Sequence, residues 1–370
     1  MIHVNTLASL ETQITRLGIA LEPNGDASEI EGVLNPGSAR SRDGKLLLYP
    51  RAVAAGNTSR IGLVEASGSP DAPIFARIGF ALEPQETYEI RDVPGGNGCE
   101  DPRVTFVPLL DAYVMCYTAF GPSGPRIAFA LSNDGYAWTR LGLADFSAPG
   151  LPNGDDKDAA FFPEPVISPR GVPSLAFYHR PMNHVSAIDA CAALPIILAM
   201  PARDRESTRV AYVPLDAVLH DRSNLVRVAE SALVLEPAHD WGRVKNGGGT
   251  PPLRIDEGWL SFFHGVDAQY DAAGKCSGMR YSAGIVIHDF ERPHLVRYRS
   301  PAPVFAPETV DERRGMVNNV VFPTAIDVRP GARPREFDVY YGMADSRVGR
   351  IAFALGASTT VGAGEEESAA

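Results

Sequence analysis

The sequence has few cysteines, no excess of basic residues and no long apolar run at its start. Its cysteines form no CxxC pair and are widely spaced, so we expect reduced thiols rather than a disulfide framework or a zinc site. The four are Cys99, Cys116, Cys191 and Cys276. The formal net charge of -11 argues against a nucleic-acid partner or an anionic membrane, although it leaves room for a local cationic pocket. Residues 1–5 show no secretory signal, and we therefore expect a cytoplasmic location.

The composition is that of a globular protein able to bury a sizeable core, with 45% hydrophobic and 21% charged residues. The 35 glycines and 31 prolines fit an architecture rich in tight turns. Because an internal repeat covers nearly the whole chain, we predict one domain over residues 1–361. Residues 362–370 contain three consecutive glutamates and small residues, and we predict a disordered acidic tail there.

The repeat occurs five times. In each copy a proline at a strand entrance is followed by one apolar strand, a second, and a third that opens with arginine. The prolines are Pro36, Pro102, Pro163, Pro251 and Pro323. The second strands are residues 46–49, 113–117, 175–179, 259–264 and 337–341, and the opening arginines are Arg60, Arg126, Arg209, Arg280 and Arg350. The copies follow one another at roughly 60 to 90 residues, and each contains several short strands. This pattern predicts an all-β fold, a five-bladed β-propeller.

Two segments fall outside the repeat. Residues 1–30 are read either as a short helix around Leu10–Leu17 or as a strand that closes the ring with the final strand, Arg350–Leu355. The segment Met182–Arg205 interrupts the third blade, and its Ala187–Met200 part predicts a short helix, which Pro195 and its length make unfit to span a bilayer. A packing helix and a lid or oligomer contact both remain open for it.

The strongest local signal for chemistry is the run from Gly95 to Arg103. Its glycines let the backbone approach a ligand, and Glu100 and Asp101 stand together where a loop becomes a strand, with Arg103 within reach of either carboxylate. Because neighbouring side chains of a strand point to opposite faces, we expect only one of the two carboxylates to face a pocket. A salt-bridged turn is the alternative interpretation.

Corresponding places in the other blades also carry polar residues, and a propeller would direct all of them toward one axis. At strand entrances these are Asn35, Lys157, Asp158, Thr250, Asn318 and Asn319, and at strand ends Arg51, His179, Arg180, His264 and Asp345. Taken singly, each is as well explained as a capped turn or a hydrogen-bonded core group.

The charges of this set suit a sugar that is bound beside an anion such as phosphate. The cations are Arg51, Arg126, Lys157, Lys245 and, if protonated, His264. The glycine run Lys245–Gly249 offers backbone N–H groups to the same anion. Nearby aromatic residues are either a sugar platform or core packing; they are Tyr117, Phe162, Phe263, Tyr281, Phe322 and Tyr341.

Several of these motifs, in this order, resemble glycoside hydrolase family 130, the β-mannoside phosphorylases and related mannosidases. The resemblance extends over roughly residues 30 to 355. It is carried by Asn35-Pro36, Leu48-Tyr49-Pro50-Arg51, Cys99-Glu100-Asp101-Pro102-Arg103, Asp156-Lys157-Asp158 through Pro163-Glu164, His179-Arg180-Pro181, Phe263-His264-Gly265, Val320-Val321-Phe322-Pro323 and Tyr340-Tyr341-Gly342-Met343-Ala344-Asp345. The family fold is a five-bladed β-propeller, which agrees with the repeat count.

The resemblance implies that Asp101 is the general acid of an inverting phosphorolysis. Inorganic phosphate attacks the anomeric carbon while Asp101 protonates the glycosidic oxygen through the mannose 3-hydroxyl, so no second carboxylate and no metal is needed. The implied phosphate-binding residues are Arg51, Arg126, Lys157, Lys245 and His264. The implied substrate-binding residues are Asn35, Arg103, Asp158, His179, Tyr281, Phe322 and Asp345.

Two other functions stay open. A hydrolase of the same family would need a carboxylate to activate water opposite the acid, for which Glu164, Asp158 and Asp267 are candidates. A non-catalytic carbohydrate-binding propeller would leave Asp101 structural. For a phosphorylase, the expected partners are phosphate and a β-linked manno-oligosaccharide, or mannosyl-glucose or mannosyl-N-acetylglucosamine, with no nucleic acid or membrane. A homo-oligomer is an open expectation.

Overall fold

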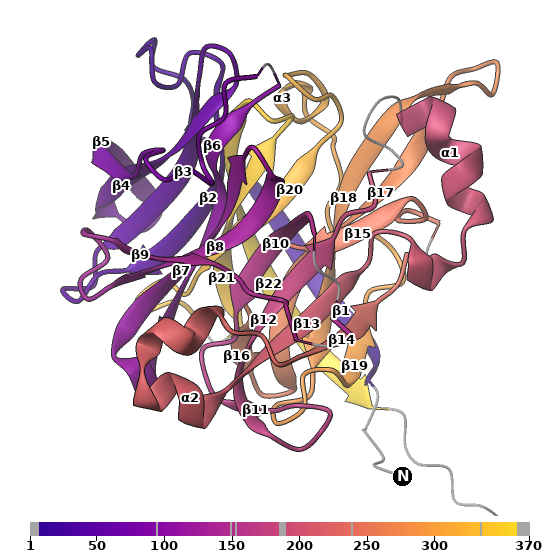
Figure 1. Cartoon of the computed structure of the whole chain (residues 1–370). Coiled ribbons are helices and arrows are strands. Elements are labelled where there is room, and N and C mark those ends of the chain that lie inside the picture. Colours follow the sequence, from indigo (N-terminus) through magenta and orange to yellow (C-terminus); the bar gives the residue numbers. More distant parts are fainter. Residues whose placement is uncertain are drawn as a thin grey trace, which may run out of the picture.

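The structure is a computed structural model that describes residues 7–93, 95–148, 150–151, 154–184, 190–237, 240–333 and 335–360. Figure 1 shows strands filling the body of the molecule, with helices α1 and α2 at its periphery. The prediction of an all-β fold is confirmed. The predicted tail, residues 362–370, lies outside the described residues.

The largest sheet has eight strands in the order β2-β3-β4-β6-β7-β8-β9, with β5 paired to β4. Its strands are β2 Gly32–Arg40, β3 Leu46–Ala54, β4 Thr58–Ser69, β5 Ala72–Leu82, β6 Asn97–Val107, β7 Ala112–Gly121, β8 Gly124–Ser132 and β9 Thr139–Leu143. The pairs are antiparallel except at β4 and β6, where Thr58 pairs with Asn97 and Ser59 with Gly98 in parallel. This short seam divides the sheet into two antiparallel halves, β2 to β5 and β6 to β9.

Each of the other three sheets has a path of four antiparallel strands. The second comprises β10 Asp156–Phe161, β12 Pro173–Pro181, β13 Thr208–Pro214 and β14 Glu230–Leu235, with β11 Val166–Ile167 on β12. The third comprises β15 Lys245–Gly248, β17 Gly258–Tyr270, β18 Cys276–His288 and β19 Val296–Arg299, with β16 Leu253–Ile255 on β17. The fourth comprises β20 Val321–Asp327, β21 Glu336–Met343, β22 Arg347–Thr360 and β1 Leu7–Leu21. All second and third strands of the predicted repeat lie within observed strands.

The first strand of the chain completes the last sheet. β1 pairs antiparallel with β22, from Leu7 opposite Thr360 to Leu21 opposite Val348. Figure 1 shows the indigo β1 beside the yellow β22. Of the two interpretations of residues 1–30, the pairing strand is therefore correct and the helix around Leu10–Leu17 is wrong. The bulges of β1 let Leu7, Leu10 and Ile14 all pack on the apolar cluster of this sheet.

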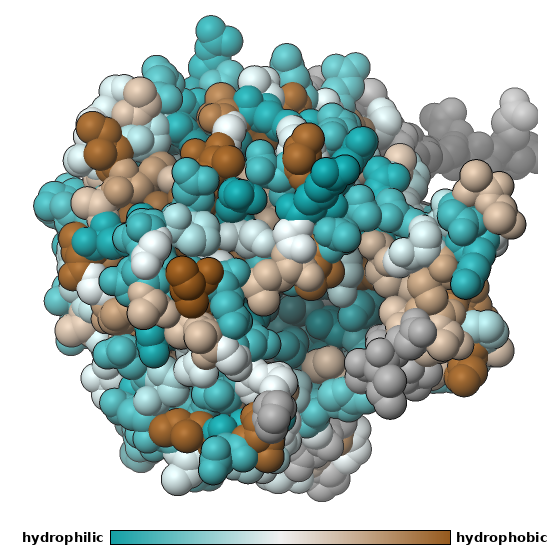
Figure 2. All heavy atoms as spheres, turned by 90° about the horizontal axis from the view of Figure 1, so that it is seen from above, coloured by the Kyte–Doolittle hydropathy of each residue, from teal (hydrophilic) through white to brown (hydrophobic). Residues whose placement is uncertain are grey.

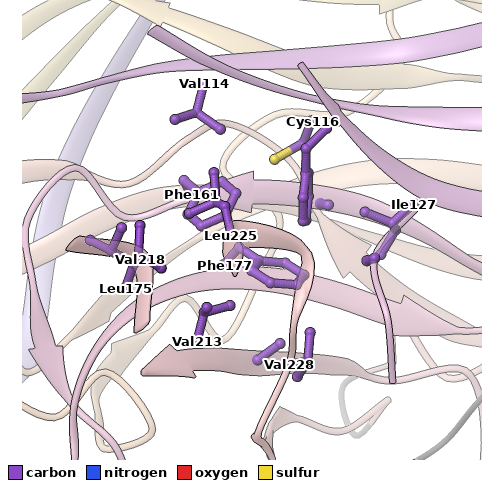
Figure 3. Close-up of a cluster of buried hydrophobic side chains, with 14 of the residues drawn as sticks. Val114, Cys116, Ile127, Phe161, Leu175, Phe177, Val213, Val218, Leu225 and Val228 are labelled. Atoms are coloured by element: carbon purple, nitrogen blue, oxygen red, sulfur yellow. The ribbon is translucent and has the colours of Figure 1, made fainter. Parts of the chain in front are cut away.

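Neighbouring sheets pack through aromatic and β-branched side chains. In the cluster of Figure 3, Phe161 of β10 and Phe177 of β12 lie with ring centroids 5.0 Å apart, and Phe129 of β8 meets both. The cluster thus joins the largest sheet to the second sheet. Such alternating inward residues account for the strand pattern of the sequence.

Three α-helices and three short 3-10 helices connect the strands of the described residues. They are α1 Ala190–Ala199, α2 Leu215–His220, α3 Val310–Arg313, and the 3-10 turns Pro108–Leu110, Ala202–Asp204 and Arg222–Val226. α1 lies between β12 and β13, inside the segment predicted to be helical, whereas residues 185–189 lie outside the described part. None of the helices in the described residues has the length and apolar character needed to cross a membrane.

The expectation of four reduced thiols is wrong. Cys191 of α1 forms a disulfide with Cys276 of β18, whereas Cys99 and Cys116 are buried free thiols. The two bonded cysteines are 85 residues apart in sequence, and only the fold brings α1 beside β18, so spacing gave no signal. Disulfides persist mainly in oxidising compartments. The state of the cysteines therefore no longer supports a cytoplasmic location.

The buried carboxylate of Glu312 ties the two chain ends together, and we predict that Glu312→Ala lowers the free energy of unfolding by about 3 kcal/mol or more. Glu312 accepts hydrogen bonds from Arg16 Nε of β1 at 2.9 Å and from Tyr341 Oη of β21 at 2.9 Å. Its side chain is fully buried. Urea unfolding followed by fluorescence measures the change.

The matched control is Glu308→Ala. Glu308 also pairs with Arg16, at 2.8 Å, but its side chain is 65% exposed. Its loss should therefore cost under about 1 kcal/mol. Equal costs for the two substitutions would contradict the importance of the buried tie.

Candidate active site

A repeated backbone distortion builds the centre of the candidate site. Asn35, Asp101 and Asp158 have φ values of 43°, 46° and 64°, in the left-handed region that Asn and Asp tolerate better than most residues. Each lies in the first strand of its group, at a shift of register against the second strand, which is characteristic of a β-bulge. The bulges re-aim these three short polar side chains: Asn35 and Asp101 meet directly, and Asp158 is linked to Asp101 through Arg103.

Asp101 is buried at the junction of β2, β3 and β6. Its Oδ1 accepts a hydrogen bond from Asn35 Nδ2 at 2.9 Å and lies 3.4 Å from Arg51 NH1. Burial raises the pKa of Asp101, but the charges of Arg51, Lys157 and Arg103 and the Asn35 hydrogen bond outweigh burial, so the pKa lies below its usual value. Without a further charge in the site, Asp101 is therefore ionised.

Glu100 faces the same cations as Asp101. Its carboxylate lies 3.0 Å from Arg51 NH2 and 2.9 Å from Lys157 Nζ, with the Glu100 side chain 3% exposed. The expectation that only one of these two carboxylates faces the pocket is therefore wrong. The bulge between Glu100 and Arg103 breaks the strict alternation on which that expectation depended.

Arg103 binds the first strands to one another. It is buried and donates from NH1 to the Asp101 carbonyl at 2.9 Å and from Nε to the Gly249 carbonyl at 3.1 Å. Its NH2 also lies 3.6 Å from Asp158 Oδ1. These contacts tie Arg103 to the backbone at Asp101 and Gly249 and to the Asp158 carboxylate, and the expected substrate contact of Arg103 stays a prediction.

A second charged cluster surrounds Asp158. Arg180 Nε donates to Asp158 Oδ2 at 2.6 Å, and Arg180 also pairs with Glu206. Lys245 Nζ lies 4.0 Å from Glu206. The charges of Arg180 and its neighbours outweigh burial and hold the pKa of Asp158 well below its usual value. Glu206 was missed in the sequence because no motif marks it, and Arg180 was noted as a strand end and in the motif His179-Arg180-Pro181, but without a role in the site.

His264 is neutral in this setting, which corrects its expected role as a cation. Burial, together with the charges of Arg180, Lys245 and Arg103, lowers the pKa of His264 to about 3. Its ring stacks on Tyr281, with centroids 5.9 Å apart, and meets Phe322 edge-on at 4.6 Å. Its buried Nδ1 has no hydrogen-bond partner among the described residues. His264 therefore offers a ligand a neutral hydrogen-bonding group.

The glycine run after Lys245 is a strand, which argues against an anion-binding loop. Residues 245–248 form β15 and pair with β17, and Gly249 N donates to the Phe262 carbonyl at 3.0 Å. A Cβ at Gly247 would lie 2.2 Å from Asp158 Oδ2. The glycines thus let β15 pack closely against the Asp158 cluster, and the expected supply of free N–H groups is not seen at Gly249.

One predicted site residue, His179, has its hydrogen bonds outside these clusters, and another, Arg126, lies on a neighbouring strand. His179 is fully buried, with Nδ1 2.7 Å from Asp156 and Nε2 2.8 Å from Ser231, so both nitrogens already have partners. Strand alternation directs its neighbour Arg180 toward Asp158 instead. Arg126 lies on β8, opposite Ala119, two strands outward from β6.

Asp345 lies in the turn between β21 and β22, where Ala344 and Asp345 have φ values of 46° and 51°. Burial and the negative charge of Asp101 raise the pKa of Asp345 to about 6, against the opposing effect of Arg51 and Lys157. The two aspartates thus differ in protonation at mildly acidic pH, below about 6, where Asp345 holds its proton and Asp101 is ionised. Gly342, just before this turn, makes room for Asn35, because a Cβ there would lie 2.0 Å from Asn35 Oδ1.

Figure 2 looks down on the molecule from the top of Figure 1 and shows a hollow near the middle of that face, floored by hydrophilic residues. A surface cavity of about 430 Å³ is bordered by Trp241, Tyr270 and Arg280.

We predict that Asp345→Asn stabilises the protein above pH 6. The pKa of Asp345 is about 6 in the folded protein, against a usual value of 3.8. Below pH 4 the carboxyl is protonated and costs no stability, and this stability is lost as the pH rises through 6 and the buried carboxyl ionises. The substitution removes this loss, so the gain in unfolding free energy should be largest above pH 6 and vanish toward pH 4. Thermal melts from pH 4 to pH 8 measure it.

Asp43→Asn is the control for this experiment. A hydrogen bond from Ser41 lowers the pKa of the exposed Asp43 carboxyl, so its replacement should stabilise the protein at no pH. An Asp345→Asn variant that is less stable than the wild type at pH 7 would contradict the assignment.

Comparison with known proteins agrees with the motifs. The family model described as beta-1,4-mannooligosaccharide phosphorylase, that of glycoside hydrolase family 130, matches residues 203–355. A beta-1,4-mannooligosaccharide phosphorylase of Ruminococcus albus is 36% identical over 117 residues, which are 31% of this chain and 32% of the relative. The matched segment thus spans about a third of that relative.

Two further comparisons cover most of the chain. A 1,2-beta-oligomannan phosphorylase of Thermoanaerobacter is 26% identical over 286 residues, 76% of this chain and 75% of the relative. The structure of a beta-1,2-mannobiose phosphorylase from Listeria innocua superposes with a TM-score of 0.64, at 20% identity, over 92% of this chain and 96% of the other; at that identity it shows the fold alone. The resemblance read from the motifs is confirmed to this extent: a glycoside hydrolase family 130 model matches residues 203–355, and the relatives that this chain resembles are named mannoside phosphorylases.

Proposed function

We propose that the protein is an inverting β-mannoside phosphorylase, which cleaves a β-mannoside with inorganic phosphate to give α-mannose 1-phosphate and a shortened sugar. The observation that carries the proposal is the arrangement around Asp101: two cations, Arg51 and Lys157, are held by Glu100 directly beside a buried carboxyl. A phosphorylase needs this combination, because its nucleophile is an anion that must be held close to the acid.

We also propose that the strands form five blades of a propeller. If the largest sheet is divided at its two-residue parallel seam, the strands fall into five antiparallel groups, one for each copy of the repeat. Each group has four strands, not counting the short strands β11 and β16. The pairing of β1 with β22 would close the ring. This arrangement would explain why Asn35, Asp101 and Asp158, each from the first strand of a group, meet at one place.

In the proposed reaction, a phosphate oxygen attacks the anomeric carbon as the glycosidic bond breaks, and the leaving oxygen receives the proton of Asp101. The acid must therefore be protonated when substrate is bound. The positive charges of Arg51 and Lys157 now lower the pKa of Asp101. A phosphate dianion bound by these cations would offset their charge, so its arrival would raise the pKa of Asp101 and prepare the acid.

The rival hydrolytic mechanism requires a carboxylate free to activate water. Each candidate for that role is instead paired with an arginine: Asp158 with Arg180 at 2.6 Å, Asp267 with Arg243 at 2.8 Å and Glu164 with Arg254 at 2.7 Å. These pairs favour phosphorolysis. A protein that only binds sugar would not need two cations, Arg51 and Lys157, beside Asp101.

Within this proposal, inorganic phosphate is the co-substrate and no metal or other cofactor is required. Tyr281 and Phe322, which contact His264, would line the sugar site, and Lys245 would complete the cationic side. The named relatives act on both β-1,4 and β-1,2 mannosides, so the linkage and the acceptor sugar stay open. The cytoplasmic location and a homo-oligomer likewise stay predictions.

Incubation with a panel of β-1,4- and β-1,2-mannobioses and manno-oligosaccharides tests the proposal. We predict that mannose 1-phosphate accumulates in proportion to the sugar cleaved, and that cleavage stops when phosphate is omitted. Anion-exchange chromatography separates and quantifies mannose 1-phosphate and free mannose. Equal release of free mannose with and without phosphate would establish hydrolysis instead.

Two variants serve as controls in that assay. Asp101→Asn retains the shape of the acid but cannot transfer its proton, so turnover should fall at least about a hundredfold. Glu164→Gln removes a carboxylate whose side chain is 44% exposed and should leave turnover near the wild-type value. Undiminished turnover in Asp101→Asn would exclude Asp101 as the acid.

A further inference from the structure

The inserted helix α1 packs against the strands that carry one wall of the site. Ala193, Leu194 and Ile197 of α1 form an apolar cluster with Val244 and Val266. The partly buried residues of this cluster are Leu198, Ala268, Cys276, Met279 and Tyr281. The disulfide and a site residue, Tyr281, thus belong to one packed unit, which Figure 1 shows at the edge of the molecule beside β17 and β18.

The N-terminal end of α1 is linked to the aromatic part of the site by the disulfide. Cys276 and Tyr281 both lie on β18, five positions apart. The Tyr281 ring stacks on His264, and Lys245 Nζ lies 5.6 Å from the centroid of the same ring. A shift of β18 at Cys276 would therefore move the ring that supports both His264 and Lys245.

The C-terminal end of α1 is linked to the charged part of the site. Arg205 NH2 donates to the carbonyls of Leu198 and Met200, each at 2.9 Å, and Arg205 NH1 donates to the Arg243 carbonyl at 2.7 Å. The next residue, Glu206, pairs with Arg180 and lies 4.0 Å from Lys245.

The backbone of Glu206 is also tied to the site strand β15, because Asn246 N donates to the Glu206 carbonyl at 3.1 Å. Both ends of α1 are thus fastened to groups that surround Asp158 and Lys245. By contrast, Asp101, Glu100 and Arg51 lie on β3 and β6, whereas the main strand contact of α1 among the described residues is with β18. A change in α1 should therefore act on ligand binding and spare the acid.

We propose that the Cys191–Cys276 disulfide is a redox-sensitive positioning device that sets the affinity of the Lys245–His264 side of the site for phosphate. The closed bond holds α1 on β18 and keeps Tyr281, Lys245 and Glu206 in place; opening it loosens this wall. The inference rests on the proposed function. In the redox step a dithiol supplies two electrons and two protons, the two cysteines become thiols, and the dithiol becomes a disulfide.

The bond is placed where a small reductant reaches it. Cys191 and Cys276 are only partly buried, and their neighbours Ala192 and Ser277 are exposed. The other two thiols, Cys99 and Cys116, are buried, and burial raises the pKa of each, which makes them unreactive. Mild reduction should therefore change a single site on the molecule.

The test measures binding of inorganic phosphate to the full chain by isothermal titration calorimetry, before and after reduction with a dithiol. We expect the Kd for phosphate to rise by about fivefold or more on reduction, the range typical of coupling between distinct sites, and to return on reoxidation. Titration of accessible thiols verifies the redox state. In turnover assays the KM for phosphate should rise with the Kd while kcat changes little, a split that a general loss of structure would not give.

The double variant Cys191→Ala/Cys276→Ala is the matched control. It should bind phosphate as the reduced wild type does, and a dithiol should not change it further. If reduced protein with a native circular dichroism spectrum binds phosphate with an unchanged Kd, this inference is overturned and the proposed function is unaffected. Reduced protein and double variant that have both lost their native circular dichroism would also overturn it, since the bond would then be a stability element. Oxidised protein that binds no phosphate would overturn the proposed function and this inference with it.

Discussion

The carboxylate of Glu100 lies between Arg51 and Lys157, and the geometry of the candidate site depends on this double ion pair. Two cations that approach the same acid would repel each other in a buried place, and burial alone would favour their neutral forms. Glu100 pairs with both cations, which reduces their repulsion, and fixes both side chains beside Asp101. The site is therefore organised before any ligand arrives, and the cost of bringing an anion close to the acid is reduced.

The backbone makes this ion pair possible. A regular strand would turn Glu100 and Asp101 to opposite faces, but the left-handed φ of Asp101 lets both carboxylates reach Arg51. The same distortion at Asn35 and Asp158 brings their side chains to Asp101 and to Arg180. Asn and Asp accept this conformation at a lower cost than most residues, and they are also the residue types for which we propose roles in the site.

Much of the fold and part of the site could be predicted from the sequence. The alternation of apolar residues located the strands, and motifs such as Glu100-Asp101-Pro102-Arg103 located Asp101, Arg51 and Lys157 because each sits at a repeated strand boundary. The bulge, the buried state of Arg103 and the neutral His264 could not be predicted, since they depend on burial and on partners from other strands. Glu206 and the Cys191–Cys276 bond depend on contacts of α1, an insertion outside the repeat.

We propose that the cations beside Asp101, the proposed acid, keep it ionised until phosphate binds. The most direct measurement is the pKa of the Asp101 carboxyl by carbon-13 NMR, without phosphate and with saturating phosphate, using Asp101→Asn to assign the signal. The account predicts a pKa below the usual value for aspartate without phosphate and a clear rise when phosphate is bound. A pKa that is the same in both conditions would contradict it.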